Sequence, residues 1–166
     1  KAGRIMMQGQ EVTIPRPHVA TQLGIALIHQ EPLAFPDLTV AENIYVGAEP
    51  TLGHTGWLDW PAIYTRSKEL LGSLGLDIDP RAQMRGLSVA DRQMVDMAAA
   101  LGQDARILIM DEPTAALTPS EVERLFALIR ALRDRGAAIV FISHRLEEVT
   151  AICDRITVMR DGEIVG

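Results

Sequence analysis

Cysteine, lysine and long hydrophobic runs are scarce in this chain of 166 residues. Cys153 is the only cysteine, so an intrachain disulfide is impossible and nothing indicates an oxidising compartment. The longest apolar stretches, such as residues 137–142, are far too short to span a bilayer, and no signal peptide is recognisable. Lys1 and Lys68 are the only lysines. Their positions exclude a phosphoacceptor receiver domain with Asp111 as acceptor, because such a domain needs a lysine at a later strand end.

The composition is typical of a soluble globular domain with a real core, since 48% of the residues are hydrophobic and 23% are charged. The 16 basic and 22 acidic residues give a net charge of -6. This balance argues against a nucleic-acid-binding surface spread over the whole chain. The histidines His18, His29 and His54 lack metal-ligand spacing, so we expect no zinc site there.

The most informative stretch is residues 106–119. Its continuous apolar run, residues 107–110, predicts a short parallel strand buried on both faces. Asp111 and Glu112 follow at the carboxyl end of that strand, where ligands of open α/β sheets bind. Taken alone, the stretch equally fits a strand that ends in solvated acids at a turn.

The rest of the chain alternates strand and helix patterns, which predicts an α/β fold with a parallel sheet and a helical insert. We expect residues 3–12 to form two strands separated by a turn at Gly9. Further strands are expected at residues 25–28, at 137–142, where the strand should be buried, and at 155–159. The last of these should form a hairpin with residues 163–165. Caps and terminators predict helices at residues 17–24, 39–46, 59–75, 88–101, 118–136 and 146–152.

Polar side chains follow three of the expected strands: Gln30, the pair Asp111 and Glu112, and His144. Because parallel strands end at one edge of a sheet, we expect these residues to gather there. Ser88 opens a helix, whose free backbone N–H groups can hold an anion. Each residue alone has an ordinary explanation, as a loop residue, a strand-end residue or a helix cap. Their order and sheet position together favour a single polar site.

Phosphoryl transfer to water fits this set of side chains. Asp111 can hold a magnesium ion through water, and Gln30 can reach that ion or the attacking water. Glu112 can orient and deprotonate the water. His144 can donate to the terminal phosphate, and the helix N-terminus at Ser88 can face an anion.

These residues and their spacing resemble the ATP-binding cassette (ABC) ATPases over the whole chain. The string Ile-His-Gln-Glu-Pro around Gln30 is similar to their Q-loop, and residues 87–93 are similar to their signature motif. Residues 107–112 resemble Walker B with its catalytic glutamate, residues 115–118 resemble the D-loop, and His144 resembles the switch histidine.

Departures from the commonest motifs resemble one subclass. Val89 and Ala90 replace the glycines of Leu-Ser-Gly-Gly-Gln, and Thr118 replaces the usual D-loop aspartate. These changes are similar to the ATPase subunits of bacterial importers of the ribose, galactose and xylose type, which carry two cassettes in tandem. The intact Glu112 and His144 resemble the catalytic residues of the first of these two cassettes, which is the catalytically competent one. Asp91 departs from the glutamine usual there; its charge is favourable in the first turn of a helix but unfavourable beside a phosphate.

The resemblance implies ATP and Mg²⁺ as cofactors and a P-loop-NTPase-like parallel sheet. It implies nucleotide contacts at Gln30, Ser88, Val89, Ala90 and Asp111, metal ligands at Asp111 and Gln30, and catalytic roles for Glu112 and His144. The implied partners are transmembrane permease subunits, a second cassette and, indirectly, a periplasmic sugar-binding protein, with no nucleic acid. The implied location is the cytoplasmic face of the cell membrane, as a peripheral subunit.

The phosphate-binding loop of the family, Gly-x-x-x-x-Gly-Lys-Ser/Thr, does not occur in these residues. We therefore expect a fragment with a partial ATPase core at 1–30 and 101–166, a helical subdomain at 31–100 and a natural N-terminus further upstream. Two alternatives remain. The chain could be a nucleotide-free binding module that is inactive on its own, or a non-transport cassette ATPase of DNA repair or translation, against which the compact insert and acidic charge argue.

Overall fold

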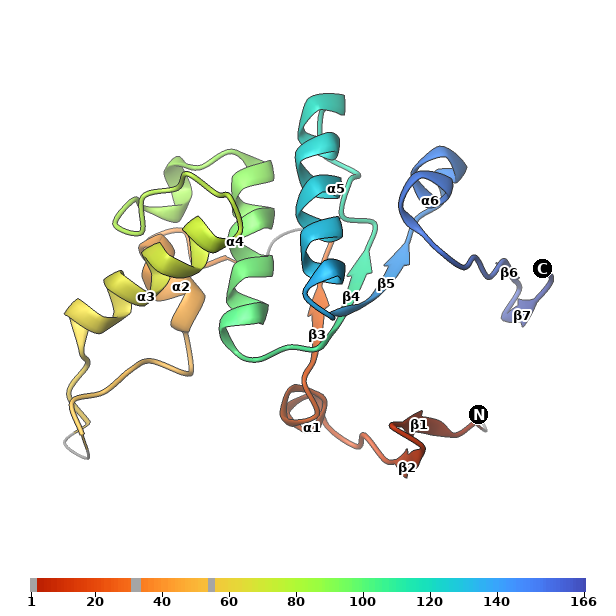
Figure 1. Cartoon of the computed structure of the whole chain (residues 1–166), viewed down its shortest axis with the longest axis horizontal. Coiled ribbons are helices and arrows are strands. Elements are labelled where there is room, and N and C mark those ends of the chain that lie inside the picture. Colours follow the sequence, from red (N-terminus) through yellow and green to blue (C-terminus); the bar gives the residue numbers. More distant parts are fainter. Residues whose placement is uncertain (1–2, 31–33, 54–55) are drawn as a thin grey trace.

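The computed structural model describes residues 3–30, 34–53 and 56–166. Figure 1 shows a central sheet with a group of helices beside it and a small hairpin at each end of the chain. The strands are β1 (Ile5–Met7), β2 (Gln10–Val12), β3 (Ile25–Ile28), β4 (Ile107–Asp111), β5 (Ala138–Ile142), β6 (Met159–Arg160) and β7 (Glu163–Ile164). The helices are α1 (Pro17–Gln22), α2 (Val40–Tyr45), α3 (Trp60–Ser73), the short 3-10 helix η1 (Met84–Gly86), α4 (Val89–Gly102), α5 (Pro119–Asp134) and α6 (Leu146–Ile152).

The central sheet is parallel, as the alternation of strands and helices predicts. Its strand order is β3-β4-β5, and Met110 of β4 lies between Ile28 of β3 and Phe141 of β5. The chain reaches β4 from β3 through α2, α3 and α4, and it reaches β5 from β4 through α5. Such crossovers are required between parallel neighbours, and they bring all three carboxyl ends to the same edge.

One face of the sheet packs against helices and forms the core. Leu108 and Met110 are fully buried on this face, and Phe141 meets Phe126 of α5 edge-on at 6.0 Å between ring centroids. The apolar stripe of α5 recurs at helical spacing, so that Leu125, Ile129 and other members point into the same core. The helix begins at a Thr118–Glu121 capping box, as predicted.

The expected burial of residues 137–142 is wrong, and the expected burial of residues 107–110 on both faces is confirmed only in part. Leu27, Val140 and Ile142 are 49%, 48% and 46% exposed, and their side chains alternate with buried or partly buried ones along β3 and β5. Ile109, on this same face of β4, is only partly buried. Because α4 and α5 pack on the face of Leu108, the alternate side chains face away from this core. A continuous apolar run gave no indication that its two faces differ.

The C-terminal strand is shorter than expected. Residues 155–158 lie outside any strand, and β6 begins at Met159 and pairs with β7. Backbone bonds between Val158 and residues 165–166 continue the pairing irregularly. The predicted turn is confirmed: Asp161 and Gly162 both have positive φ, at 55° and 82°, which suits a tight hairpin.

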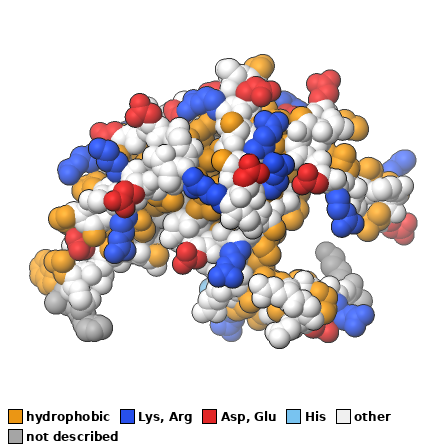
Figure 2. Space-filling model, viewed as in Figure 1, with side chains coloured by type: hydrophobic (Ala, Val, Ile, Leu, Met, Phe, Trp, Pro, Cys, Tyr) orange, Lys and Arg blue, Asp and Glu red, His pale blue; other side chains and the backbone are white. Residues whose placement is uncertain are grey.

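Helices α2, α3 and α4 pack together beside the sheet (Figure 1). The first turn of α2 is anchored from outside the helix, because the backbone N–H groups of Val40 and Ala41 donate to the carbonyls of Ala82 and Pro80. Thr39 and Glu42 form the predicted capping box, in which the Thr39 N–H donates to Glu42 at 2.7 Å. These bonds satisfy donors that every helix start leaves open. Acidic and basic side chains are interspersed on the face shown in Figure 2.

None of the helices in the described part of the chain combines the length and apolar character needed to cross a bilayer.

Replacing Thr39 by Ala removes the hydroxyl of this capping box. We expect Thr39→Ala to lower the free energy of unfolding by about 1 kcal/mol, as measured by urea denaturation. Thr65→Ala is the matched control, because Thr65 is exposed within α3, where Ala is the better helix former. Equal effects of the two substitutions would show that the capping box contributes nothing measurable.

Candidate functional site

The strand ends bring the predicted polar residues to one edge of the sheet, as expected. Asp111 is the last residue of β4 and pairs with Ile142 of β5. The Glu112 N–H then donates to the Ile142 carbonyl at 2.9 Å, which carries the pairing one residue beyond β4. Gln30 follows β3 at the same edge, since Ile28 pairs with Met110. The edge therefore carries an amide, two carboxylates and an imidazole.

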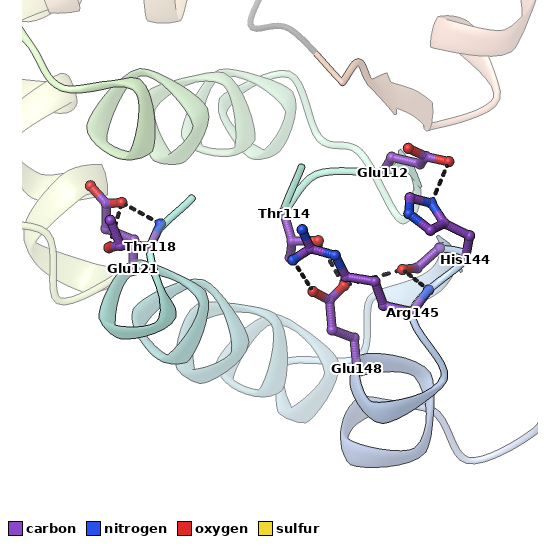
Figure 3. Close-up of polar contacts among 8 residues, drawn as sticks. Glu112, Thr114, Thr118, Glu121, His144, Arg145 and Glu148 are labelled. Carbon is purple, nitrogen blue, oxygen red and sulfur yellow. Dashed lines mark hydrogen bonds and ion pairs between the residues drawn. The ribbon is translucent and has the colours of Figure 1, made fainter. Parts of the chain in front are cut away.

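Glu112 and His144 are in direct contact. His144 Nδ1 lies 3.0 Å from Glu112 Oε1, and Figure 3 shows the two side chains pointing toward each other from the loops after β4 and β5. With Glu112 ionised, its carboxylate can only accept, so Nδ1 carries the proton of this bond and Nε2 is left for another partner. The side chains are 33% and 71% exposed, and exposed pairs contribute only about 0–1 kcal/mol. Stability therefore does not explain the pair.

Glu112 also has an unusual backbone. Its φ is 45°, in the left-handed region, which costs a non-glycine residue about 1–2 kcal/mol. The conformation turns the chain sharply out of β4, and the Glu112 carbonyl accepts from the Ala115 N–H at 3.2 Å. Strain of this kind occurs at functional sites as well as at ordinary turns such as the one at Asp161.

The side chains of Asp111 and Gln30 are exposed, whereas that of Glu112 is partly buried. No hydrogen bond or ion pair ties the Asp111 carboxylate or the Gln30 amide to another described residue. No cluster of three or more His, Cys, Asp or Glu side chains that could hold a metal occurs in the described ranges. His54, one of the histidines judged not to bind zinc, lies outside those ranges.

Ser88 lies at the start of α4, and not at the end of a strand of the central sheet. It caps α4, accepts from the Asp91 N–H at 3.1 Å and donates its hydroxyl to Asp91 Oδ2 at 2.8 Å. The other oxygen of Asp91 lies 3.3 Å from Arg124 of α5, so the charge that departs from the usual motif is paired within the chain. Val89 is 40% exposed, but Ala90 is fully buried. A ligand at this helix start can therefore meet Val89, whereas the methyl group of Ala90 points into the core.

The structure adds a buried carboxylate that the sequence analysis missed. Glu148, in the first turn of α6, is only 9% exposed. Its Oε2 accepts from Thr114 at 2.7 Å and from Ser143 at 3.1 Å, and its Oε1 accepts from Arg145 at 3.0 Å (Figure 3). Burial alone would raise the pKa of Glu148. The hydrogen bonds from these three side chains and the charge of Arg145 outweigh burial and lower the pKa below its usual 4.5.

A second buried polar residue was also missed. Gln93 is 1% exposed, and its Nε2 donates to the His29 carbonyl at 3.2 Å. The bond ties α4 to the segment that leads into Gln30. A glutamine within an amphipathic helix pattern gave no signal of burial, because its partner lies 64 residues away.

The family described as "ABC transporter" matches residues 1–115, which is more than half of the chain. The chain is 51% identical over 165 residues to a ribose import ATP-binding protein of Streptomyces avermitilis. It is 52% identical over 161 residues to another of Streptomyces coelicolor. These matches cover 99% and 97% of the chain and 32% of each relative's length. The chain belongs to the ABC transporter family, and the expected family is confirmed.

Solved structures share the fold. The ADP conformation of an ATP-binding cassette of an ABC transporter matches with a TM-score of 0.83 at 25% identity, over 99% of this chain and 68% of that one. The structure of cbiO1 from Clostridium perfringens, part of the ABC transporter complex cbiONQ, matches with a TM-score of 0.80 at 24% identity, over 99% and 64%. The predicted α/β fold is that of an ATP-binding cassette.

The lowered pKa of Glu148 predicts a pH-dependent contribution to stability. A carboxyl whose pKa is lower in the folded chain stabilises it fully above the unfolded pKa, and this stabilisation is lost as pH falls through the folded pKa. We expect Glu148→Gln to lower the free energy of unfolding by about 2 kcal/mol near pH 7.

The loss of unfolding free energy caused by Glu148→Gln should become smaller once the pH falls below 4.5, the ordinary pKa of this carboxyl group. Denaturant titrations across this range provide the measurement. Glu147→Gln is the control, since Glu147 is exposed in the same turn. A loss for Glu148→Gln that stays constant down to about pH 3 would contradict the ionised, hydrogen-bonded state.

Proposed function

We propose that this chain is part of an ATP-hydrolysing subunit that powers carbohydrate import, with Glu112 and His144 carrying the hydrolysis step. The observation that carries the proposal is the 3.0 Å contact between His144 Nδ1 and Glu112 Oε1 at two adjacent strand ends. Membership of the ABC transporter family supports ATP as the substrate. The import of a carbohydrate is supported by the relatives, which are named ribose import ATP-binding proteins.

Glu112 is the proposed general base. Its carboxylate accepts a proton from the attacking water, the water oxygen bonds to the terminal phosphorus, and the bond from that phosphorus to its bridging oxygen breaks, which gives ADP and phosphate. His144 holds Glu112 through Nδ1–H. In the doubly protonated imidazole, Nε2 is a donor as well, and it can stabilise charge on the terminal phosphate.

Asp111 and Gln30 suit a magnesium ion, which prefers oxygen ligands and keeps several of its waters. Both side chains are exposed at neighbouring strand ends, and neither is tied to another described side chain. A bound magnesium ion supplies charge neutralisation for the phosphates. Two protein ligands leave room for water and phosphate oxygens, so the donor set fits.

The start of α4 is the proposed contact with nucleotide held by a second cassette. Ser88 provides a hydroxyl, and the first backbone N–H groups of α4 around Val89 and Ala90 provide donors at the positive end of the helix dipole. Asp91 would oppose an anion here, but its pairing with Arg124 offsets that charge. Because Ser88 also donates to Asp91, it must exchange this bond for one to phosphate.

The domain arrangement and partners are part of the same proposal. Residues 1–30 and 101–166 form a partial ATPase core, and 31–100 form a helical subdomain, supported by the packing of α2, α3 and α4 on one another. Permease subunits contact the helical subdomain, the sugar-binding protein acts only indirectly, and the subunit lies at the cytoplasmic face of the membrane. The alternative is a binding module without activity of its own.

The test is a chimera in which residues 1–166 replace the matching segment of the Streptomyces avermitilis relative. We expect Glu112→Gln to reduce kcat for phosphate release about a hundredfold to ten-thousandfold, because a general base contributes that much. Bound ATP should persist, since the substitution keeps the shape of the side chain.

Glu123→Gln is the matched control, because Glu123 is exposed on α5 away from the strand ends. Rapid hydrolysis by Glu112→Gln would refute the role of Glu112 as base. A chimera that binds ATP without hydrolysing it, even with Glu112 intact, would favour the binding-module alternative.

A further inference from the structure

We propose that Glu148 is a positioning residue that holds His144 against Glu112. The proposal rests on the proposed function of the Glu112–His144 pair and assigns to Glu148 no contact with substrate. Glu148 is the buried carboxylate at the start of α6, and hydrogen bonds from three side chains converge on it.

A single oxygen of Glu148 joins the two loops that carry the pair. Thr114 lies in the loop after β4, just beyond Glu112, and Ser143 directly precedes His144 after β5. Both hydroxyls donate to Oε2 of Glu148, at 2.7 Å and 3.1 Å. The relative position of the two loops is therefore fixed at this atom, adjacent to the residues that must meet.

The second carboxylate oxygen of Glu148 binds the residue that follows His144. Arg145 directly follows His144, and its guanidinium donates to Glu148 Oε1 at 3.0 Å. The Arg145 N–H also donates to Ser143 Oγ at 3.1 Å, so the backbone of the three residues forms a closed turn. His144 is thus held from both neighbours, while its own ring projects toward Glu112 (Figure 3).

The bond between Thr114 and Glu148 is buried, whereas the pair of Glu112 and His144 is more exposed. Thr114 is 2% exposed and Glu148 is 9% exposed, so their bond is shielded from water and its loss would leave buried polar atoms without partners. His144 is largely exposed, and an exposed ion pair does not by itself hold two loops together. The buried bonds can therefore fix the geometry that the exposed pair requires.

A role limited to stabilising α6 makes a different prediction. Glu147 and Glu148 both lie in the first turn of α6, where any acid interacts favourably with the helix dipole. Only Glu148 receives the bonds from Thr114 and Ser143. If interaction with the helix dipole were the only role of Glu148, Glu147→Gln and Glu148→Gln would change the contact between His144 and Glu112 to the same extent.

The experiment measures contact between His144 and Glu112 by NMR in the whole 166-residue chain. His144→Gln assigns the ring proton signals of His144 among the four histidines. We expect Glu112→Gln to shift these signals in an otherwise unchanged chain, because it replaces the carboxylate that Nδ1 contacts. In a Glu148→Gln background, the same Glu112→Gln substitution should shift them at least threefold less.

Thr114→Val provides an independent second variant, because it removes the buried hydroxyl and leaves Glu148 in place. We expect Thr114→Val to weaken the response to Glu112→Gln, and Glu147→Gln to leave it unchanged. Circular dichroism verifies that each variant is folded at the temperature of the measurement. If Glu148→Gln does not fold, Thr114→Val decides the question alone.

A full response to Glu112→Gln in either the Glu148→Gln or the Thr114→Val background would overturn the proposal. The same holds if Glu112→Gln fails to shift the His144 signals in the otherwise unchanged chain. No ATP is present in this experiment. Its failure is therefore distinct from failure of the proposed function, which phosphate release by the chimera tests.

Discussion

The backbone pairing of β4 with β5 is the constraint on which the candidate site depends. It places Asp111 opposite Ile142 and extends through the Glu112 N–H, so the loops after both strands leave the sheet at the same level. The left-handed turn at Glu112 then directs its carboxylate toward His144 rather than along the strand. A one-residue shift in this pairing would reverse which side chains face the core and separate the two functional groups.

The sequence predicted this edge because its signals are local. A short apolar run, two acids and a proline identify the end of β4 without knowledge of the fold, and capping boxes identify the helix starts at Thr39 and Thr118. Burial was predicted less well, since it depends on what packs against each face. The apolar residues of β5 alternate between the α5 side and an exposed side, and nothing in the run Ala137–Ile142 distinguishes the two.

The residues that support the site could not be found in the same way. Glu148 looks like an ordinary first-turn acid, and its bond to Thr114 spans 34 residues. Gln93 donates to a carbonyl 64 residues away. Asp91 was expected to oppose phosphate, whereas in the folded chain it is paired with Arg124, which lies on another helix. Each of these contacts joins two loops or helices whose approach is set by core packing, so only the fold reveals it.

The most direct test of the central claim is whether Glu112 and His144 act as one unit in ATP turnover. The measurement compares kcat for four forms of the chimera: unchanged, Glu112→Gln, His144→Gln and the double variant. Residues that work through a shared contact lose activity non-additively. The loss in the double variant should therefore be close to that of the more damaging single variant. A double loss equal to the product of the two single losses would show that the residues act independently and would contradict a shared site.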